Sequence, residues 1–143
     1  MRILRLLATQ GPQPAVDVRS GLPLIPVGSE LYAQGLSLIG PEAGCRHVGR
    51  VHPYLNNLNR LGLIWFSRDP IKDPKRYQVI EAQPDVTAAL ERAGRLGHTI
   101  RRSVHLTPFG ADFCEVCLPV DTHDFESVVA GELAEPAGEP VSR

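Results

Sequence analysis

HPYLNNLNRLGLIWFS, residues 52–67, predicts a helix that stops at a glycine and continues directly into a strand. Pro53 suits the first turn of a helix, where the N–H that proline lacks would have no helical partner. The apolar side chains share one helical face, with the asparagines and Arg60 mostly on the other; the apolar set is Tyr54, Leu55, Leu58 and Leu61. Gly62 is a natural C-terminal stop, and 63–67 then form the strand.

Downstream of this block the pattern predicts two more strands and a further helix. Residues 68–76 form a polar loop with two Asp-Pro turns, and 76–80 follow as a second strand. Residues 84–96 place their apolar side chains on one helical face, closed by a glycine. Residues 100–106 alternate between apolar and polar side chains, which is typical of a third strand.

Upstream of the block the sequence is less regular. Residues 1–9 have apolar side chains at helical spacing, and 15–18 fit a short strand. Two prolines restrict 20–29 to a loop or the edge of a sheet. Residues 36–39 are expected to be irregular or a short strand, followed by a helical turn from Pro41.

The order of these elements predicts an α+β fold. We expect a winged helix-turn-helix-like domain over residues 1–120, with a small antiparallel sheet and with the helix at 84–96 inserted in the wing. Thr107 is a good N-cap for the last helix, whose apolar stripe is Phe109, Phe113, Val116 and Cys117. One core should bury Leu58, Leu61, Ile64, Phe66, Leu106, Phe109 and Phe113 together.

The composition indicates one globular domain with a separate acidic tail. The chain has 143 residues and a net charge of -1. Residues 1–120 carry 14 basic and 10 acidic side chains, whereas residues 121–143 carry one basic and six acidic side chains. We expect 121–143 to be disordered. No apolar run is long enough for a membrane span, and three cysteines favour a reducing cytoplasm over a disulfide framework.

Cys114 and Cys117 form a C-x-x-C spacing near the end of the last helix. A redox pair needs its thiolate at a helix N-terminus, where the helix dipole lowers the thiol pKa, and this pair lies at the opposite end. Zinc needs four ligands, which Cys45 and His47 would complete. A helical C-x-x-C within a phenylalanine-rich stripe is most often packing, because free cysteine behaves as a small hydrophobe. We therefore expect packing, with no metal and no cofactor.

Basic and amide side chains make DNA the alternative partner. Basic side chains of the wing, which begins with the polar loop at 68–76, and of the returning strand at 100–106 can contact phosphates. The amide and basic side chains of the helix at 53–61 can contact base edges. The candidate residues are Asn56, Arg60, Arg68, Lys72, Lys75, Arg76, Arg101 and Arg102. The modest net charge of residues 1–120 and the two aspartates of the wing weigh against DNA binding.

An enzyme is not expected. Ser103, His105 and Asp112 have the composition of a hydrolytic triad, but alternate residues of a strand share a face by periodicity alone. The run DTHD at 121–124 offers metal ligands, yet it lies at the edge of the expected tail, where a solvated polar cluster is the better interpretation.

Four blocks together resemble one bacterial family: MRILRLLATQGPQPAVDV, YLNNLNRLGLIWFS, RYQVIE and RRSVHLTPFGADFCEVCLP. They look like the C-terminal part of the abortive infection alpha (Abi-alpha) family, over roughly residues 1–119. The Leu-Gly-Leu-Ile and Leu-Thr-Pro-Phe-Gly blocks are also similar to MarR-like winged helices. The Abi-alpha family is associated with phage resistance and offers no catalytic residues to carry over.

The resemblance also bears on the partner. Members of the family normally have further sequence before the RILRLL helix, so the partner is expected to be another protein or a missing N-terminal region of the same protein. We therefore expect a cytoplasmic, non-enzymatic protein-interaction module associated with bacterial phage defence, with DNA binding as the alternative.

Overall fold

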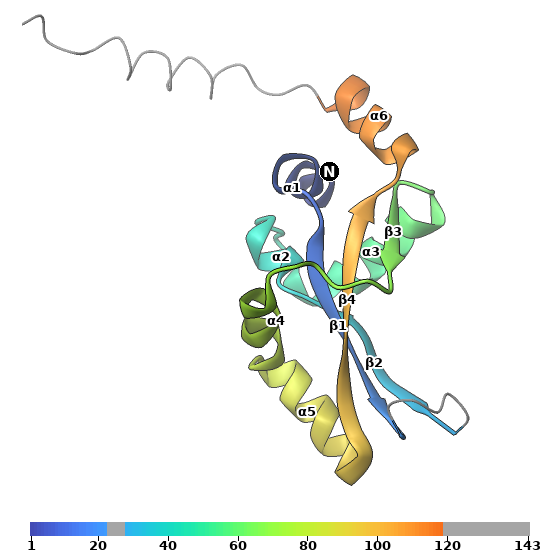
Figure 1. The fold of residues 1–143 in the computed structure, drawn as a ribbon. Coiled ribbons are helices and arrows are strands. Elements are labelled where there is room, and N and C mark those ends of the chain that lie inside the picture. Colours follow the sequence, from blue (N-terminus) through green and yellow to red (C-terminus); the bar gives the residue numbers. More distant parts are fainter. Residues whose placement is uncertain (23–27, 119–143) are drawn as a thin grey trace, which may run out of the picture.

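The computed structural model describes residues 1–22 and 28–118, which form six α-helices and a four-stranded antiparallel sheet (Figure 1). Short 3-10 turns lie at Val48–Arg50 and Gly94–Leu96. In chain order the main elements are α1 (Arg2–Gln10), β1 (Gln13–Ser20), β2 (Glu30–Leu36), α2 (Ile39–Glu42), α3 (Val51–Arg60), β3 (Ile64–Ser67), α4 (Pro74–Glu81), α5 (Pro84–Ala93), β4 (Gly97–Leu106) and α6 (Pro108–Cys117).

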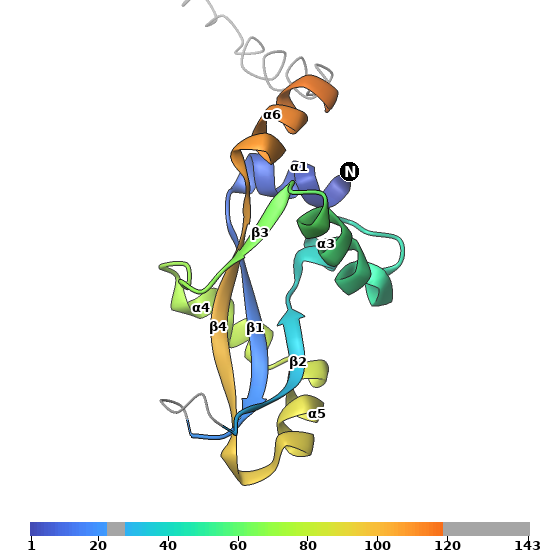
Figure 2. The same cartoon turned by 90° about the vertical axis from the view of Figure 1, so that its right-hand side faces the viewer.

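Two long strands form the middle of the sheet. The strand order is β2-β1-β4-β3, and β1 pairs with β4 over its whole length (Figure 2). Successive side chains of β1 enter two different apolar clusters, as the alternation of a strand requires. Ala15 joins a cluster with α1 and α3, whereas Val16 and Val18 pack against α4 and α5. The sheet therefore separates two cores.

Local signals account for the starts of α4 and α6. Asp73 caps α4 by accepting a hydrogen bond from the N–H of Lys75 over 3.0 Å. Thr107 caps α6 by accepting one from the N–H of Gly110 over 2.9 Å, as its sequence position predicted. Each helix then has proline in its first turn, where no helical N–H is lost.

The strand predicted at 76–80 is wrong, because these residues belong to α4. Tyr77 and Ile80 are both buried against β1, and a separation of three residues brings side chains together on a helix but not on a strand. The Asp-Pro step before them, which we interpreted as a turn, is the cap of this helix.

The α+β class is confirmed, whereas the wing differs from the expectation. β3 and β4 pair directly, but α4 and α5 connect them in place of a simple hairpin. The insertion thus holds two helices, of which only α5 was predicted. β1 is longer than expected, and the strand expected near 36–39 ends at Leu36. The predicted acidic tail, 121–143, lies outside the described residues.

The predicted core is right in part. Ile64 is buried, and Leu58, Phe66, Leu106 and Phe113 pack against the first cluster while partly exposed. Leu61 and Phe109 are instead 56% and 60% exposed, so their predicted burial is wrong. For Phe109 the cause is the seating of α6, which turns Gly110 and Cys114 inward and leaves Phe109 at the surface.

Candidate binding cleft along the edge strand

A buried aspartate lies in the middle of β1. The side chain of Asp17 is only 2% exposed, and its two oxygens have different partners. Arg102 of β4 donates from Nε to Oδ2 over 2.5 Å, and the backbone N–H of Gly35 in β2 donates to Oδ1 over 2.9 Å. Because a buried carboxylate needs both pairing and hydrogen bonds, these contacts explain how a charge is accommodated in an apolar strand.

The contact with Gly35 holds an irregularity in β2. The pairing of β1 with β2 shifts register here, so that Gln34 and Gly35 together lie opposite Asp17. Two residues opposite one make a β-bulge. Gly35 has a φ of 66°, a conformation that glycine adopts at little cost. The buried carboxylate therefore fixes the shape of the edge strand.

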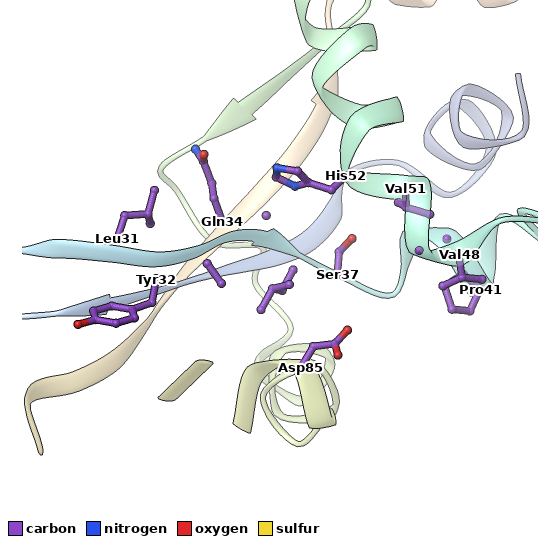
Figure 3. A pocket seen from close by; sticks show the side chains of 14 residues that line it. Leu31, Tyr32, Gln34, Ser37, Pro41, Val48, Val51, His52 and Asp85 are labelled. Carbon is purple, nitrogen blue, oxygen red and sulfur yellow. The ribbon is translucent and has the colours of Figure 1, made fainter. Parts of the chain in front are cut away.

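A cleft of about 500 Å³ opens along this edge strand (Figure 3). β2 lines it with consecutive residues, and α2, the turn before α3, the first turn of α3 and Asp85 of α5 supply the remaining wall. Apolar and polar side chains both contribute: Leu31, Gln34, Ser37, Val48, Val51 and His52.

A second register shift, between Val18 and Arg19 of β1, determines which side chains of β2 lie together, because it leaves Tyr32 as an extra residue between Leu31 and Ala33. In a regular strand, residues three apart point to opposite faces. Leu31 and Gln34 nevertheless project to the same side of β2, toward His52 (Figure 3). Tyr32 points the other way and packs against the second cluster. This second shift thus places one apolar and one amide side chain on the side of the cleft.

A second set of polar contacts joins α4 to the sheet. The Tyr77 hydroxyl donates to the carbonyl oxygen of Arg102 and accepts from the N–H of Ile71, each over 2.7 Å. Burial raises the pKa of Tyr77. On the same helix Glu81 accepts hydrogen bonds from Arg101, and these lower the pKa of Glu81. The insertion is therefore attached to β4 through polar groups as well as apolar ones.

The nucleic-acid candidates fall into two groups. Arg76, Arg101 and Arg102 donate hydrogen bonds to side chains within the fold, namely those of Gln13, Glu81 and Asp17. The other candidates are exposed: Asn56, Arg60, Arg68, Lys72 and Lys75. They belong to two segments, α3 and the region from the end of β3 to α4. Fewer cations thus face solvent than the sequence suggested.

Ser103 and His105 are neighbours, but their hydrogen bonds do not suit catalysis. The Ser103 hydroxyl donates to the carbonyl oxygen of Asp69 over 2.6 Å. Its Oγ also lies 2.8 Å from Nε2 of His105. Since the hydroxyl has one proton, the imidazole is the donor in this second contact, and it is not placed to take the serine proton. Asp112 is exposed on α6 and contacts neither residue through a hydrogen bond in the part of the chain that the structure describes.

The cysteines of the C-x-x-C spacing occupy different environments. Cys114 is buried, with its Sγ 3.8 Å from the carbonyl oxygen of Leu4, and burial raises the pKa of its thiol. Cys117 is exposed. Within residues 1–22 and 28–118 no cluster of side chains suited to a metal ion forms, so Cys45 and His47 do not join this pair in a ligand set. Cys114 packs as a small hydrophobe.

Asp17, Gln13 and Tyr77 organise these contacts, and sequence reasoning missed all three. A signal for Asp17 was present, because an acidic residue interrupts the apolar strand that we expected at 15–18. Nothing local indicated its partners, which come from β2 and β4.

In the described ranges no helix is long and apolar enough to cross a membrane.

Known proteins resemble this chain in fold and in sequence. A solved structure, of an uncharacterized protein from Alcanivorax borkumensis SK2, has the same fold, with a TM-score of 0.59 at 21% identity over 82% of this chain and 83% of that one. An S-adenosylmethionine:tRNA ribosyltransferase-isomerase from Carboxydothermus hydrogenoformans is 32% identical over 119 residues, which cover 76% of this chain. The chain spans only 35% of the length of that relative. The family model described as abortive infection alpha matches residues 1–117. The chain therefore belongs to the abortive infection alpha family.

Proposed function

We propose that the chain is a non-enzymatic protein-interaction module that acts in abortive infection, and that its partner adds an extended segment along β2. Membership of the family supports the link to abortive infection. The observation that carries the binding mode is the cleft, which β2 lines with its consecutive residues 31–36. β2 has β1 as its strand neighbour and is the outer strand of the sheet.

The physical basis is the chemistry of an edge strand. Such a strand presents backbone N–H and C=O groups that an added strand can pair with, and these hydrogen bonds supply affinity. Side-chain contacts beside the edge supply specificity. Leu31 and Val48 offer apolar contacts, while Gln34 and His52 offer polar ones, so the cleft suits a segment in which apolar and polar side chains alternate.

The buried network supports binding at a preformed surface. Asp17 holds the backbone of the bulge through Gly35 and is itself held by Arg102, so that this part of the edge strand is ordered before any partner arrives. A surface that is already ordered loses less conformational entropy on binding. The polar groups of the sheet are also engaged with one another, which favours binding over catalysis.

The test is selection of peptides from a random library displayed against the purified chain. We expect selected peptides to protect the amide protons of Leu31–Leu36 from hydrogen exchange. Leu31→Lys places a charge at an apolar contact and should weaken these peptides at least about tenfold, or about 1.4 kcal/mol. Leu96→Lys is the matched control, because Leu96 is an exposed leucine outside the cleft.

Two results would contradict the proposal. One is a selected peptide that leaves the exchange of β2 amides unchanged. The other is equal loss of binding in Leu31→Lys and Leu96→Lys, which would indicate a general effect of added charge and not a site at β2.

A further inference from the structure

A second cavity, of about 460 Å³, lies at the N-terminal end of α1. Its walls come from the start of α1, the loop at 45–47 and one side of α3. It shares no lining residue with the cleft along β2. The two sites can therefore be altered independently.

The charged side chains that line this cavity are all basic. Arg2 and Arg46 contribute guanidinium groups, His47 adds an imidazole, and among the described residues no aspartate or glutamate belongs to the lining. The Arg2 guanidinium donates a hydrogen bond to the carbonyl oxygen of Gly44, which holds it beside the loop. Arg46 and His47 are exposed, and no ion pair engages either of them in the described part of the chain. The rim is thus positively charged and unneutralised.

The rest of the lining is largely apolar. Ile3 is buried in the first core cluster, and Cys45, Tyr54 and Leu58 pack against that cluster while remaining partly exposed. Asn57, also on α3, adds an amide. Ligand sites of about 300–1,000 Å³ are characteristically apolar with a few placed polar groups, and this cavity has that size and composition.

We infer that the cavity binds a mononucleotide. Two guanidinium groups and an imidazole offer the charge-assisted hydrogen bonds that a phosphate accepts. The side chains of Ile3, Tyr54 and Leu58 offer an apolar surface for the base, and the Asn57 amide can donate to or accept from a base edge. The phosphate lies at the rim and the base toward the core.

The inference is tested by calorimetric titration of the whole chain, carrying any tag at its C-terminus so that the start of α1 is left unaltered. The probes are the four ribonucleoside 5′-monophosphates, with adenosine and inorganic phosphate as the two halves of the ligand. We expect at least one nucleotide to bind more tightly than either half. Affinity should also fall as salt rises, because the phosphate contact is ionic.

Matched substitutions locate the site. Arg46→Gln and His47→Gln should each weaken nucleotide binding, Arg46→Gln by about tenfold or more, because a charge-assisted contact with the phosphate is lost. Arg50→Gln is the control, since Arg50 is an exposed arginine of the same segment that lines neither cavity. Leu31→Lys should bind nucleotide as the unaltered chain does, which separates this site from the cleft along β2.

Three outcomes would overturn the inference. The first is no binding of any nucleotide. The second is inorganic phosphate binding as tightly as the nucleotides, which would mean a simple anion site without a place for the base. The third is equal weakening by Arg46→Gln and Arg50→Gln, which would assign the binding to overall charge.

Discussion

Asp17 joins three strands through one carboxylate. It belongs to β1, accepts from the edge strand β2 and pairs with Arg102 of β4. Because both partners must be present for the buried charge to be tolerated, this residue couples the shape of the edge to the pairing of the central strands. The same carboxylate that stabilises the sheet thereby holds the backbone of β2 where this strand lines the cleft.

Glu81 of α4 likewise joins two elements, because it accepts hydrogen bonds from Arg101 of β4 at a more exposed position than Asp17. This carboxylate makes the stability of the fold depend on pH. The hydrogen bond from Arg101 lowers the pKa of Glu81 below its ordinary value of 4.5. A carboxyl whose pKa is lowered in the folded state stabilises that state above the unfolded pKa, and this contribution is lost as the pH falls through the folded pKa.

We therefore expect Glu81→Gln to lower the free energy of unfolding by about 0.5–1 kcal/mol at pH 7. The difference from the unaltered chain should shrink as the pH falls below 4.5, the ordinary pKa of the carboxyl. Urea denaturation at a series of pH values measures it. Glu91→Gln, an exposed change on α5, is the control and should differ little at any pH. A Glu81→Gln difference that stays constant down to about pH 2 would contradict this account.

At the scale of elements, the seat of α6 depends on a glycine. A Cβ built on Gly110 would lie 1.9 Å from the carbonyl oxygen of Leu63, so the helix touches the backbone just before β3. The N–H of Thr107 also donates to that oxygen over 3.1 Å. This close approach fixes which face of α6 turns inward.

Gly110→Ala should therefore destabilise the chain by about 1–3 kcal/mol or more, since the backbone must move to admit the methyl group. Thermal or urea denaturation measures the loss. Gly49→Ala is the matched control, because a methyl group on Gly49 would have no heavy atom of the described residues within 4 Å and the φ of Gly49 is not in the left-handed region. Equal stability of the two variants would show that α6 is not seated as described.

Elements also show where local signals are sufficient. α3, β3, α5, β4 and α6 were predicted close to their observed positions, because caps, glycine stops and periodicity act within a turn or two of chain. α4 was missed, although its Asp-Pro cap was present. We interpreted Asp73 as part of a turn, and the burial of Tyr77 and Ile80 on one helical face is what distinguishes the two interpretations.

At the scale of the whole molecule, only the basic side chains that are not paired with acidic side chains of the fold are available to contact a polyanion such as DNA. Arg101 and Arg102 are engaged with Glu81 and Asp17, whereas Lys72 and Lys75 are exposed. DNA, the alternative partner, would have to bind through exposed basic side chains such as those of Lys72 and Lys75. The internal pairs would contribute to stability and not to phosphate contacts.

We expect any binding of duplex DNA to follow this division. Replacing both Lys72 and Lys75 with glutamine should flatten the slope of log affinity against log salt by about 1.8, at about 0.9 per phosphate contact. Arg101→Gln should leave the slope unchanged and lower stability instead. Fluorescence anisotropy with a labelled duplex across a salt series measures the slope. A change of slope in Arg101→Gln would show that this arginine leaves Glu81 to contact phosphate.

The sequence by itself determined the α+β class, most of the helices and strands, and the family. These follow from signals carried by neighbouring residues. Only the tertiary structure decided that Phe109 is exposed while Cys114 is buried, that Asp17 meets partners 18 and 85 positions away, and that two cavities flank α3. The physical reason is that burial, ion pairing and cavity shape depend on contacts between residues distant in the chain. Periodicity predicts which side chains share an apolar face of an element, but it does not predict which other element packs against that face.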